Sequence, residues 1–133
     1  MVSRLHLADP GAVGHLLRLQ AYHRVLLEAL QTRVRRKPDD VEAWRDLSVV
    51  RRQTADGDRL VRYHEALRDI TRAAAMAPKD VSILEPLAGL QIELRLNDVA
   101  AETCRRIIEI DADHAAAKQW LEQLESNPLS PSP

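Results

Sequence analysis

The sequence is poor in several residues that β-sheet proteins and many catalytic proteins use. Its 133 residues include no phenylalanine, one cysteine and four glycines, and aromatic residues make up 3% of the chain. A hydrophobic core without phenylalanine must be built from leucine, alanine, valine and isoleucine. Few turn pairs and few β-branched runs disfavour an all-β fold. A chain of this length suits one domain with one modest core.

The chain also lacks features that would place it in a membrane or in an oxidising compartment. A single cysteine, Cys104, excludes an intramolecular disulfide framework. No apolar run approaches the roughly 18–20 residues of a membrane span. The first residues, MVSRLHLADPGAVG, have no continuous apolar segment with a cleavage site, so they do not resemble a signal peptide. We therefore expect a cytoplasmic location or another reducing compartment.

Sequence motifs for catalysis are missing as well. The five histidines are scattered, and no HExxH, CxxC, GxSxG or glycine-rich phosphate-binding motif is present. The segment DADH, Asp111 to His114, contains metal-binding residue types, but its place between two expected helices favours helix capping. Cys104 is expected in the core, where a thiol is unreactive. The sequence thus predicts a protein that is not an enzyme, with no cofactor, no metal and no small-molecule substrate.

Charge is unevenly distributed, although the formal net charge is −1. Residues 1–37 contain seven basic and two acidic side chains, whereas the remainder contains twelve basic and eighteen acidic ones. The basic run is Arg33, Arg35, Arg36 and Lys37. A basic helix end is favourable in itself, but such a patch also suits an acidic protein partner, a nucleic acid or a membrane surface. A pI near 6.5 and few aromatic residues count against nucleic acid.

An internal repeat is the strongest signal in the sequence. The pattern Trp44-x-x-Leu47-Ser48 recurs as Leu84-x-x-Leu87-Ala88, 40 residues later. Further along, the spacing from Ala66 to Ala100 and from Leu84 to Lys118 is 34 residues. The period is therefore 34, with six extra residues between Leu47 and Ala66. Repeats of this length are typical of stacked helical hairpins.

The repeat resembles the tetratricopeptide repeat (TPR), whose pattern W-x2-L-G-x2-Y, A-x3-F and P recurs every 34 residues. The segments AWRDLS, EALRDITRAAAMAP and VAAETCRRIIEIDA carry the likeness, which covers about residues 38–125. Ser48 and Ala88 replace the glycine, Arg51 and Gln91 replace the tyrosine, and Ala112 replaces the second proline. The resemblance implies an all-α fold of antiparallel helix-turn-helix repeats, an α-solenoid of about six helices in a right-handed superhelical stack.

The pattern of caps and apolar residues divides the chain into six parts. Asp39 or Asp40 can cap a helix that runs to about Thr54, and Asp58 begins the next one. Asp80 can cap a third helix, and we expect Asn97 or Asp98 to cap a fourth. The predicted parts are an N-terminal arm (1–11), a long helix packed on the repeats (12–37), a first repeat with a six-residue insertion (38–78), a second repeat (79–112), a C-terminal capping helix (113–126) and a disordered tail (127–133).

Three features of these elements need an explanation. Pro86 lies inside the third of these helices, so we expect a bend in its first turn or a helix that begins near Leu84. The six extra residues are expected to add about one turn to the second helix of the first repeat and half a turn to the first. The apolar stripe of the long helix is expected to pack on the first repeat; it consists of Leu16, Leu19, His23, Leu26, Leu30 and Val34.

The TPR resemblance also implies a binding surface. In TPR proteins the first helix of each repeat lines a concave groove that binds extended or helical peptides. The corresponding residues here, with the joint between the repeats, are Glu42, Arg45, Val49, Arg52, Gln53, Lys79, Asp80, Ser82, Glu85, Gly89, Ile92 and Glu93. The heat-shock co-chaperone type of TPR clamps a terminal carboxylate with lysine and asparagine. The positions of these clamp residues hold Arg45, Val49 and Pro86 in this sequence, so no such clamp is expected.

These features predict a non-catalytic adaptor that binds a protein or peptide through the concave groove or the long N-terminal helix during assembly of a larger complex. The alternative is a structural scaffold subunit, or the terminal fragment of a larger repeat protein. A narrower alternative is the apoprotein-binding TPR domain of cytochrome c maturation factors, to which LLEALQTRVRRKPDDVEAWRDLS is similar. Trp44 is interpreted as a packing residue that faces the paired helix of its own repeat.

Overall fold

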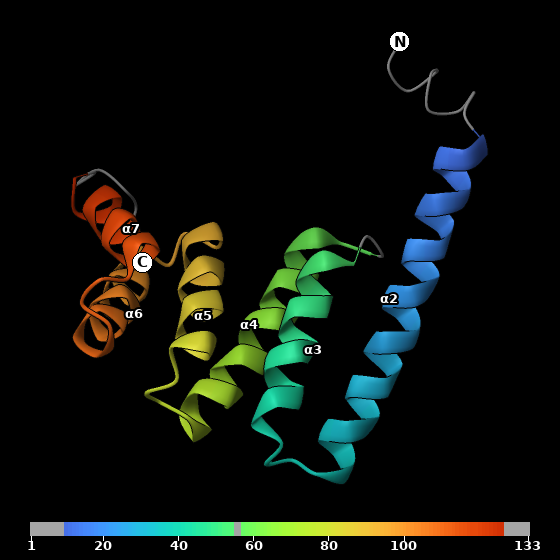
Figure 1. Ribbon diagram of the computed structural model, residues 1–133, viewed down its shortest axis with the longest axis horizontal. Coiled ribbons are helices and arrows are strands. Elements are labelled where there is room, and N and C mark those ends of the chain that lie inside the picture. The colour runs from blue at the N-terminus through green and yellow to red at the C-terminus, as the bar shows by residue number, and fades with distance from the viewer. Residues whose placement is uncertain (1–9, 55–56, 127–133) are drawn as a thin grey trace.

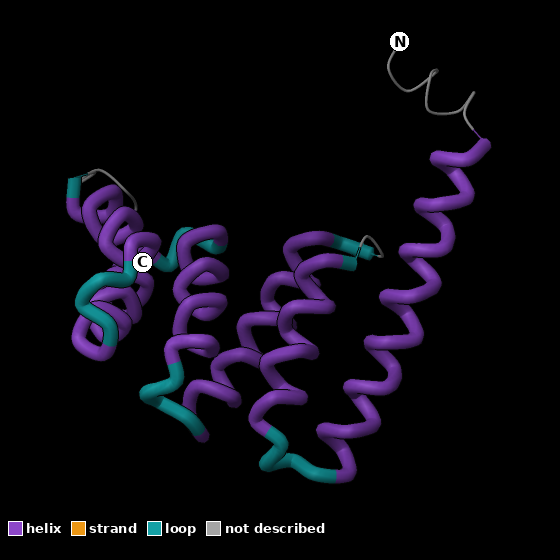
Figure 2. The backbone as a smooth tube through the Cα atoms, viewed as in Figure 1, coloured by secondary structure: helices purple, strands orange, loops and turns teal. Residues whose placement is uncertain are grey.

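The computed structural model describes residues 10–54 and 57–126, and all regular structure in them is α-helical. The six helices of these residues follow one another from one end of the molecule to the other (Figure 1) and are joined by short turns (Figure 2). They are α2 (Pro10–Arg36), α3 (Val41–Gln53), α4 (Arg59–Met76), α5 (Val81–Glu93), α6 (Asn97–Ile110) and α7 (Ala115–Glu125). The predicted all-α class is thereby confirmed. The predicted arm lies outside the described residues except for Pro10 and Gly11, which belong to α2, and the predicted tail lies outside them entirely.

Aspartates fix where three of the helices begin. The side chain of Asp40 accepts a hydrogen bond from the backbone N–H of Ala43 at 3.1 Å, which satisfies a donor at the start of α3. Asp58 does the same for Leu60 at the start of α4 (2.8 Å), and Asp80 caps α5. These caps confirm the boundaries that the sequence predicts here.

The cap predicted for α6 is wrong. Its N-cap residue is Leu96, which makes no side-chain cap bond, and Asn97 is already helical. The turn is instead stabilised by two backbone hydrogen bonds to the end of α5. The N–H of Leu96 donates to the carbonyl of Gln91 at 2.8 Å, and the N–H of Arg95 donates to the carbonyl of Ile92 at 3.0 Å. These two bonds define a Schellman motif, in which a left-handed residue ends the helix. Arg95 occupies that position with φ +62°, where glycine is usual.

Helix α5 begins at Val81 in spite of Pro86. Of the two predicted alternatives the start near Leu84 is therefore wrong, and the bend in the first turn stays a prediction. Asp80 holds the first turn. Its carboxylate accepts bonds from the backbone N–H of Ser82 at 3.0 Å and from the Ser82 hydroxyl at 2.6 Å. Proline removes the bond that its own N–H would make to the residue four positions earlier, and its ring crowds the carbonyl of that residue. The capped first turn forms without that bond.

The six extra residues of the first repeat are divided between a helix and a turn. Helix α4 has 18 residues and α6 has 14, so four residues lengthen the second helix as predicted. Helices α3 and α5 both have 13 residues, so the predicted extension of the first helix is wrong. The other two residues lie in the α3–α4 connection, which spans 54–58, against 94–96 between α5 and α6. Gly57 adopts φ +77° in that connection.

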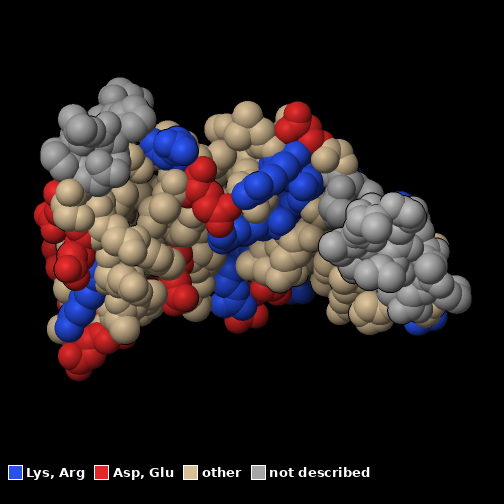
Figure 3. Space-filling view, turned by 90° about the horizontal axis from the view of Figure 1, so that it is seen from above, with Lys and Arg blue, Asp and Glu red and all other residues tan. Residues whose placement is uncertain are grey.

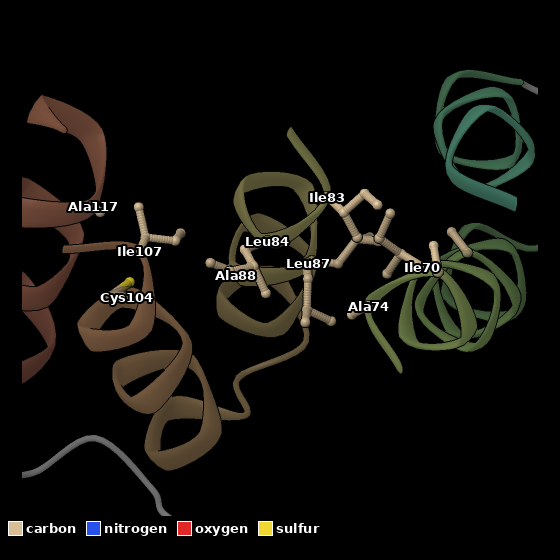
Figure 4. Packing of buried hydrophobic residues seen from close by; sticks show 12 residues of the cluster. Ile70, Ala74, Ile83, Leu84, Leu87, Ala88, Cys104, Ile107 and Ala117 are labelled. Atoms are coloured by element: carbon tan, nitrogen blue, oxygen red, sulfur yellow. The ribbon is translucent and has the colours of Figure 1, made fainter. Parts of the chain in front are cut away.

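The larger hydrophobic cluster confirms the 34-residue register. Ile70 of α4 and Cys104 of α6 are equivalent in the repeat, and both side chains are fully buried. Figure 4 shows the α5 side chains, among them Leu84 and Leu87, lying between α4 on one side and α6 and α7 on the other. Helix α5 is therefore the central layer of this cluster, with small residues such as Ala88 allowing its neighbours to approach closely.

A second cluster joins α2 to α3 and occupies one half of α2. Leu30 and Val34 are buried there together with Leu47 of α3. The N-terminal half of α2 does not pack as predicted, because α2 has 27 residues and α3 has 13. At 1.5 Å per residue α2 extends about 20 Å past α3, and it diverges from it in Figure 1. Apolar residues of this half are more than half exposed: Leu16, Leu17, Tyr22 and Val25.

The two repeats use different polar pairs at one buried position. In the first repeat the Nε of Arg51 on α3 donates to Asp69 on α4 at 2.6 Å, and Arg51 also contacts Glu65 at 3.2 Å. In the second repeat the equivalent residues are Gln91 and Thr103, whose side chains are bonded at 2.7 Å. Asp69 is 1% exposed, and this burial raises its pKa although the Arg51 charge opposes the rise. The first repeat thus has an ion pair at the position where the second repeat has a neutral hydrogen bond.

We predict that Arg95→Gly stabilises the protein by about 1 kcal/mol, because glycine adopts the left-handed conformation without the steric penalty of a side chain. Urea denaturation measures the change in the free energy of unfolding. As a control, Glu109→Gly introduces the same residue into an exposed helical position of α6 and is expected to destabilise by about 1 kcal/mol. A loss of stability in Arg95→Gly would contradict the strain at this turn.

The buried pair gives a second prediction. Arg51→Gln alone is expected to cost about 3 kcal/mol, because it leaves the buried Asp69 carboxylate without its partner. Asp69→Thr is expected to cost less, because Arg51 retains its contact with Glu65. The double variant recreates the Gln91–Thr103 pair of the second repeat and is expected to cost less than the sum by at least about 1 kcal/mol. Denaturation of the wild type, both single variants and the double variant measures this coupling. Additive effects would show that the two residues act independently.

Candidate functional site

One side of α3 and one side of α5 form the candidate binding groove. Arg45, Val49 and Arg52 recur every three or four residues and so share one side of α3. Two of them reach α5: a guanidinium nitrogen of Arg45 donates to the Ser82 hydroxyl at 3.1 Å, and Arg52 forms an ion pair with Glu93. The groove residues that the sequence predicts on the two helices are therefore brought together by direct contacts.

A pocket of about 310 Å³ lies on this surface, at the end of α3 near the α3–α4 connection. Val49, Arg52 and Gln53 of α3 line it together with Pro86 and Leu90 of α5. Ser48 and Tyr63 complete its wall. Val49 is 37% exposed, so solvent reaches this apolar side chain. The pocket can hold an apolar side chain of a partner, with polar groups at its rim.

Tyr63 of α4 gives the pocket a polar and cationic wall. The guanidinium carbons of Arg59 and Arg52 lie 5.0 Å and 5.8 Å from the centre of its ring, within the range of cation–π contacts. Burial raises the pKa of the Tyr63 phenol, but the adjacent charges of Arg59 and Arg52 lower it by more, so it lies below its ordinary value. The contacts of Tyr63 with Arg59 and Arg52 depend on how the helices pack, and no motif in the sequence indicates them.

Ion pairs and a histidine–carboxylate hydrogen bond link the helices along the groove. Glu93 of α5 contacts both Arg52 and, at 3.8 Å, Arg59. Glu85 of α5 contacts the ring Nε2 of His114, at the start of α7, at 3.0 Å. Figure 3, which views the end of the stack where α3 ends and α4 begins, shows basic and acidic surfaces side by side in the middle of the molecule. A charged ligand must therefore compete with existing ion pairs.

One residue predicted for the groove lies at a different pocket: Ile92 lines a cavity between α5 and α7, together with Trp120 and Leu124. Glu42 and Lys79 are exposed, and their place in the groove stays a prediction. Leu90 was not predicted for the groove, although it lies four residues after Pro86, a predicted clamp position, and that spacing is the signal that would have found it.

The basic run at the end of α2 is partly engaged. Arg33 forms an ion pair with Asp40 at 2.8 Å, and Arg35 donates to the hydroxyl of Thr32 at 3.2 Å. The pKa of Asp40 is lowered, first by the backbone hydrogen bond from Ala43 and further by Arg33. Arg36 and Lys37 are exposed. Part of this run therefore helps to fix the α2–α3 turn.

The residues considered for chemistry have structural roles. Burial raises the pKa of the Cys104 thiol, as expected for a core residue. The ring Nδ1 of His114 accepts a bond from the N–H of Ala117 at 3.0 Å, which confirms that DADH caps a helix. Within residues 10–54 and 57–126 no group of three or more potential metal ligands comes together. No helix among these residues has the length and apolarity that a membrane crossing requires.

Comparisons with known proteins connect this architecture to a known fold. No protein-family model and no curated protein sequence matches the chain. Among solved structures, the TPR2B domain of yeast Sti1, in a structure described as a complex with pHsp70, is similar with a TM-score of 0.63 and 18% sequence identity. The similarity covers 86% of this chain and 91% of that domain. Together with the six helices and the buried 34-residue register, this similarity shows that the protein has a TPR-like helical repeat fold.

Proposed function

We propose that the protein is a non-catalytic adaptor that binds a protein segment in the groove between α3 and α5. The observation that carries this proposal is the pocket lined by Val49, Pro86 and Leu90, an apolar cavity with cationic groups at its edge. Pockets that combine an apolar floor with a few polar groups are typical of sites that receive one anchoring side chain. The partner therefore supplies a large apolar residue.

The charges around the pocket indicate the flanking residues of the ligand. Arg52 and Arg59 share Glu93, so two cations face one carboxylate at this end of the groove. A second carboxylate from the ligand would balance them. An acidic residue next to an apolar anchor is therefore the sequence that suits this groove. The affinity gained from such exposed charges is small, up to about 1 kcal/mol per pair, so the apolar anchor supplies most of it.

The ligand differs from a clamped terminal carboxylate. The guanidinium of Arg45, which occupies one of the clamp positions, is bonded to Ser82 and lies 3.4 Å from the carboxylate of Asp46. Val49 and Pro86 offer no side-chain hydrogen-bond donor. The complex named in the description of the Sti1 structure therefore supports a peptide-binding role for this protein but not the same ligand.

A second candidate function is that of a subunit in a larger assembly, and the exposed half of α2 favours it. Leu16, Leu17, Tyr22 and Val25 of that half are more than half exposed. Exposed apolar surface of this kind is common where a protein packs against another chain. Light scattering distinguishes the candidates: obligate packing predicts association or aggregation of the isolated chain, whereas a stable monomer across the micromolar range would count against it.

Loss of the groove should remove the partner without unfolding the protein. Val49→Asp places a charge at the mouth of the pocket, where an apolar anchor would have to bury it. Affinity purification from the native source, with quantitative mass spectrometry, should show a partner enriched on the wild type and reduced at least about tenfold on the variant. Val61→Asp is the matched control, because Val61 is 56% exposed on α4 and lies outside the pocket.

The partner found in this way must also bind directly. Titration of the purified partner segment, with its apolar anchor replaced by serine, tests the contact from the other side. Equal recovery of the partner on Val49→Asp and Val61→Asp would refute binding in the groove. A charge swap, Arg52→Glu with Glu93→Arg, retains the ion pair and shows whether its orientation contributes.

A further inference from the structure

A second pocket lies on the opposite side of α3 from the groove. It has a volume of about 280 Å³ and is formed by three helices, α2, α3 and α4. Its α3 residues are Trp44, Leu47 and Arg51, which share one side of the helix by their spacing. At 100° per residue this side lies about 130° around α3 from Arg45, Val49 and Arg52. The two surfaces are therefore separate sites.

Arginines from three helices surround this pocket. Arg35 comes from α2, Arg51 from α3, and Arg68 and Arg72 from α4. Asp69 is the acidic residue among those that line it, and Arg51 already binds that carboxylate at 2.6 Å. Besides the paired Arg51 and Asp69, three further guanidinium groups therefore lie around the pocket.

An apolar wall accompanies these charges. Val34 and Leu47 are buried beside the pocket, and the half-buried indole of Trp44 completes this wall. The guanidinium of Arg72 lies over that indole, 4.9 Å from the ring centre. The Trp44 ring nitrogen donates to the carbonyl of Pro38 at 2.8 Å, which fixes the orientation of the ring. The pocket thus suits a ligand with a short apolar stem and a negatively charged end.

The second repeat provides an internal comparison. A corresponding pocket lies between α4 and α6 with α5 beneath it, lined by Leu87, Gln91, Glu102, Thr103 and Arg106 among others. By the repeat spacing these residues are equivalent to Leu47, Arg51, Arg68, Asp69 and Arg72. The apolar residue and one arginine are the same in both pockets, but a glutamate and a glutamine stand where the first pocket has arginines. The cationic character therefore does not follow from the repeat itself.

We propose that the pocket between α2 and α4 binds an aspartate or glutamate side chain of an acidic protein segment. This site is additional to the proposed groove. A carboxylate forms paired hydrogen bonds with guanidinium groups, and the aliphatic stem of glutamate fits against the apolar wall. The exposed Arg36 and Lys37 at the end of α2 extend the same cationic surface to neighbouring acidic residues of the segment.

A protein segment fits better than a nucleic acid. Single-stranded nucleic acids bind through bases stacked on aromatic faces along a continuous basic groove. Here a face of Trp44 is occupied by Arg72, and the arginines surround a single pocket between helices. The chain as a whole carries a net charge of −1, which disfavours long polyanions.

The test uses the full-length protein and a defined probe, a hexaglutamate peptide with blocked ends, with hexaglutamine as its neutral counterpart. Binding is followed by the indole ¹H–¹⁵N NMR signal of Trp44, identified with the Trp120→Phe variant. We expect hexaglutamate to shift this signal saturably and hexaglutamine to leave it unchanged. Arg68→Glu, which copies the residue of the second repeat, should weaken binding at least about fivefold.

Two controls decide between a site and general attraction. Arg105→Glu makes the same change of charge on α6, outside the pocket, and should leave the affinity within about twofold of the wild type at matched ionic strength. Equal weakening by Arg68→Glu and Arg105→Glu would overturn the proposal in favour of attraction by net charge. Saturation of the Trp44 signal by inorganic phosphate at the same or lower concentration would overturn it in favour of a small oxyanion. Val49→Asp should leave this titration unchanged, so failure of the groove and failure of this site are distinguishable.

Discussion

The indole of Trp44 is the contact through which the two apolar clusters of the protein meet. It packs against the cluster of α2 and α3 and also against the larger cluster that α4, α5, α6 and α7 share. Its ring nitrogen is bonded to Pro38 in the α2–α3 turn, and Arg72 of α4 covers its face. A helical repeat cannot bury its apolar surface alone and depends on such contacts between neighbours. Trp44 thereby connects α2 to the rest of the stack.

Because α3 is held in this way, its two sides can present different chemistry. One side contributes to a mainly apolar pocket, at whose edge Arg52 and Arg59 share Glu93. The other contributes to an arginine-rich pocket around Trp44. The buried Arg51–Asp69 pair lies at that second pocket, where the other repeat has a neutral pair. The first repeat therefore carries most of the features that we connect with binding, and the second carries the central layer of the core.

The fold could be predicted in most respects, because the 34-residue period places small or apolar residues at buried positions. Ala66, Ala100 and Ile70 lie in the core as their spacing indicates. The incorrect predictions concern helix ends, where several backbone conformations are compatible with the sequence. The α5–α6 turn contains Arg95 in the left-handed conformation, and no cap motif in the sequence indicates this. Helix α5 begins before Pro86 because a capped first turn does not need the bond that proline removes. The candidate site was only partly predictable. The groove positions on α3 follow from the repeat, but the contribution of Tyr63 and the meeting of arginines from three helices depend on how the helices pack.

Native-state hydrogen exchange of Trp44→Ala tests most directly whether this residue couples the two clusters. Loss of the ring is expected to cost about 3 kcal/mol or more, and we expect this loss to be local. Protection of amides in α2, around Leu30 and Val34, should fall well below that of amides in α6, around Cys104 and Ile107, whereas in the wild type both report the same cooperative opening. Trp120→Ala, at the α7 end, should spare α2. An equal loss of protection in α2 and α6, or no loss in either, would contradict the role of Trp44 as the link between the clusters.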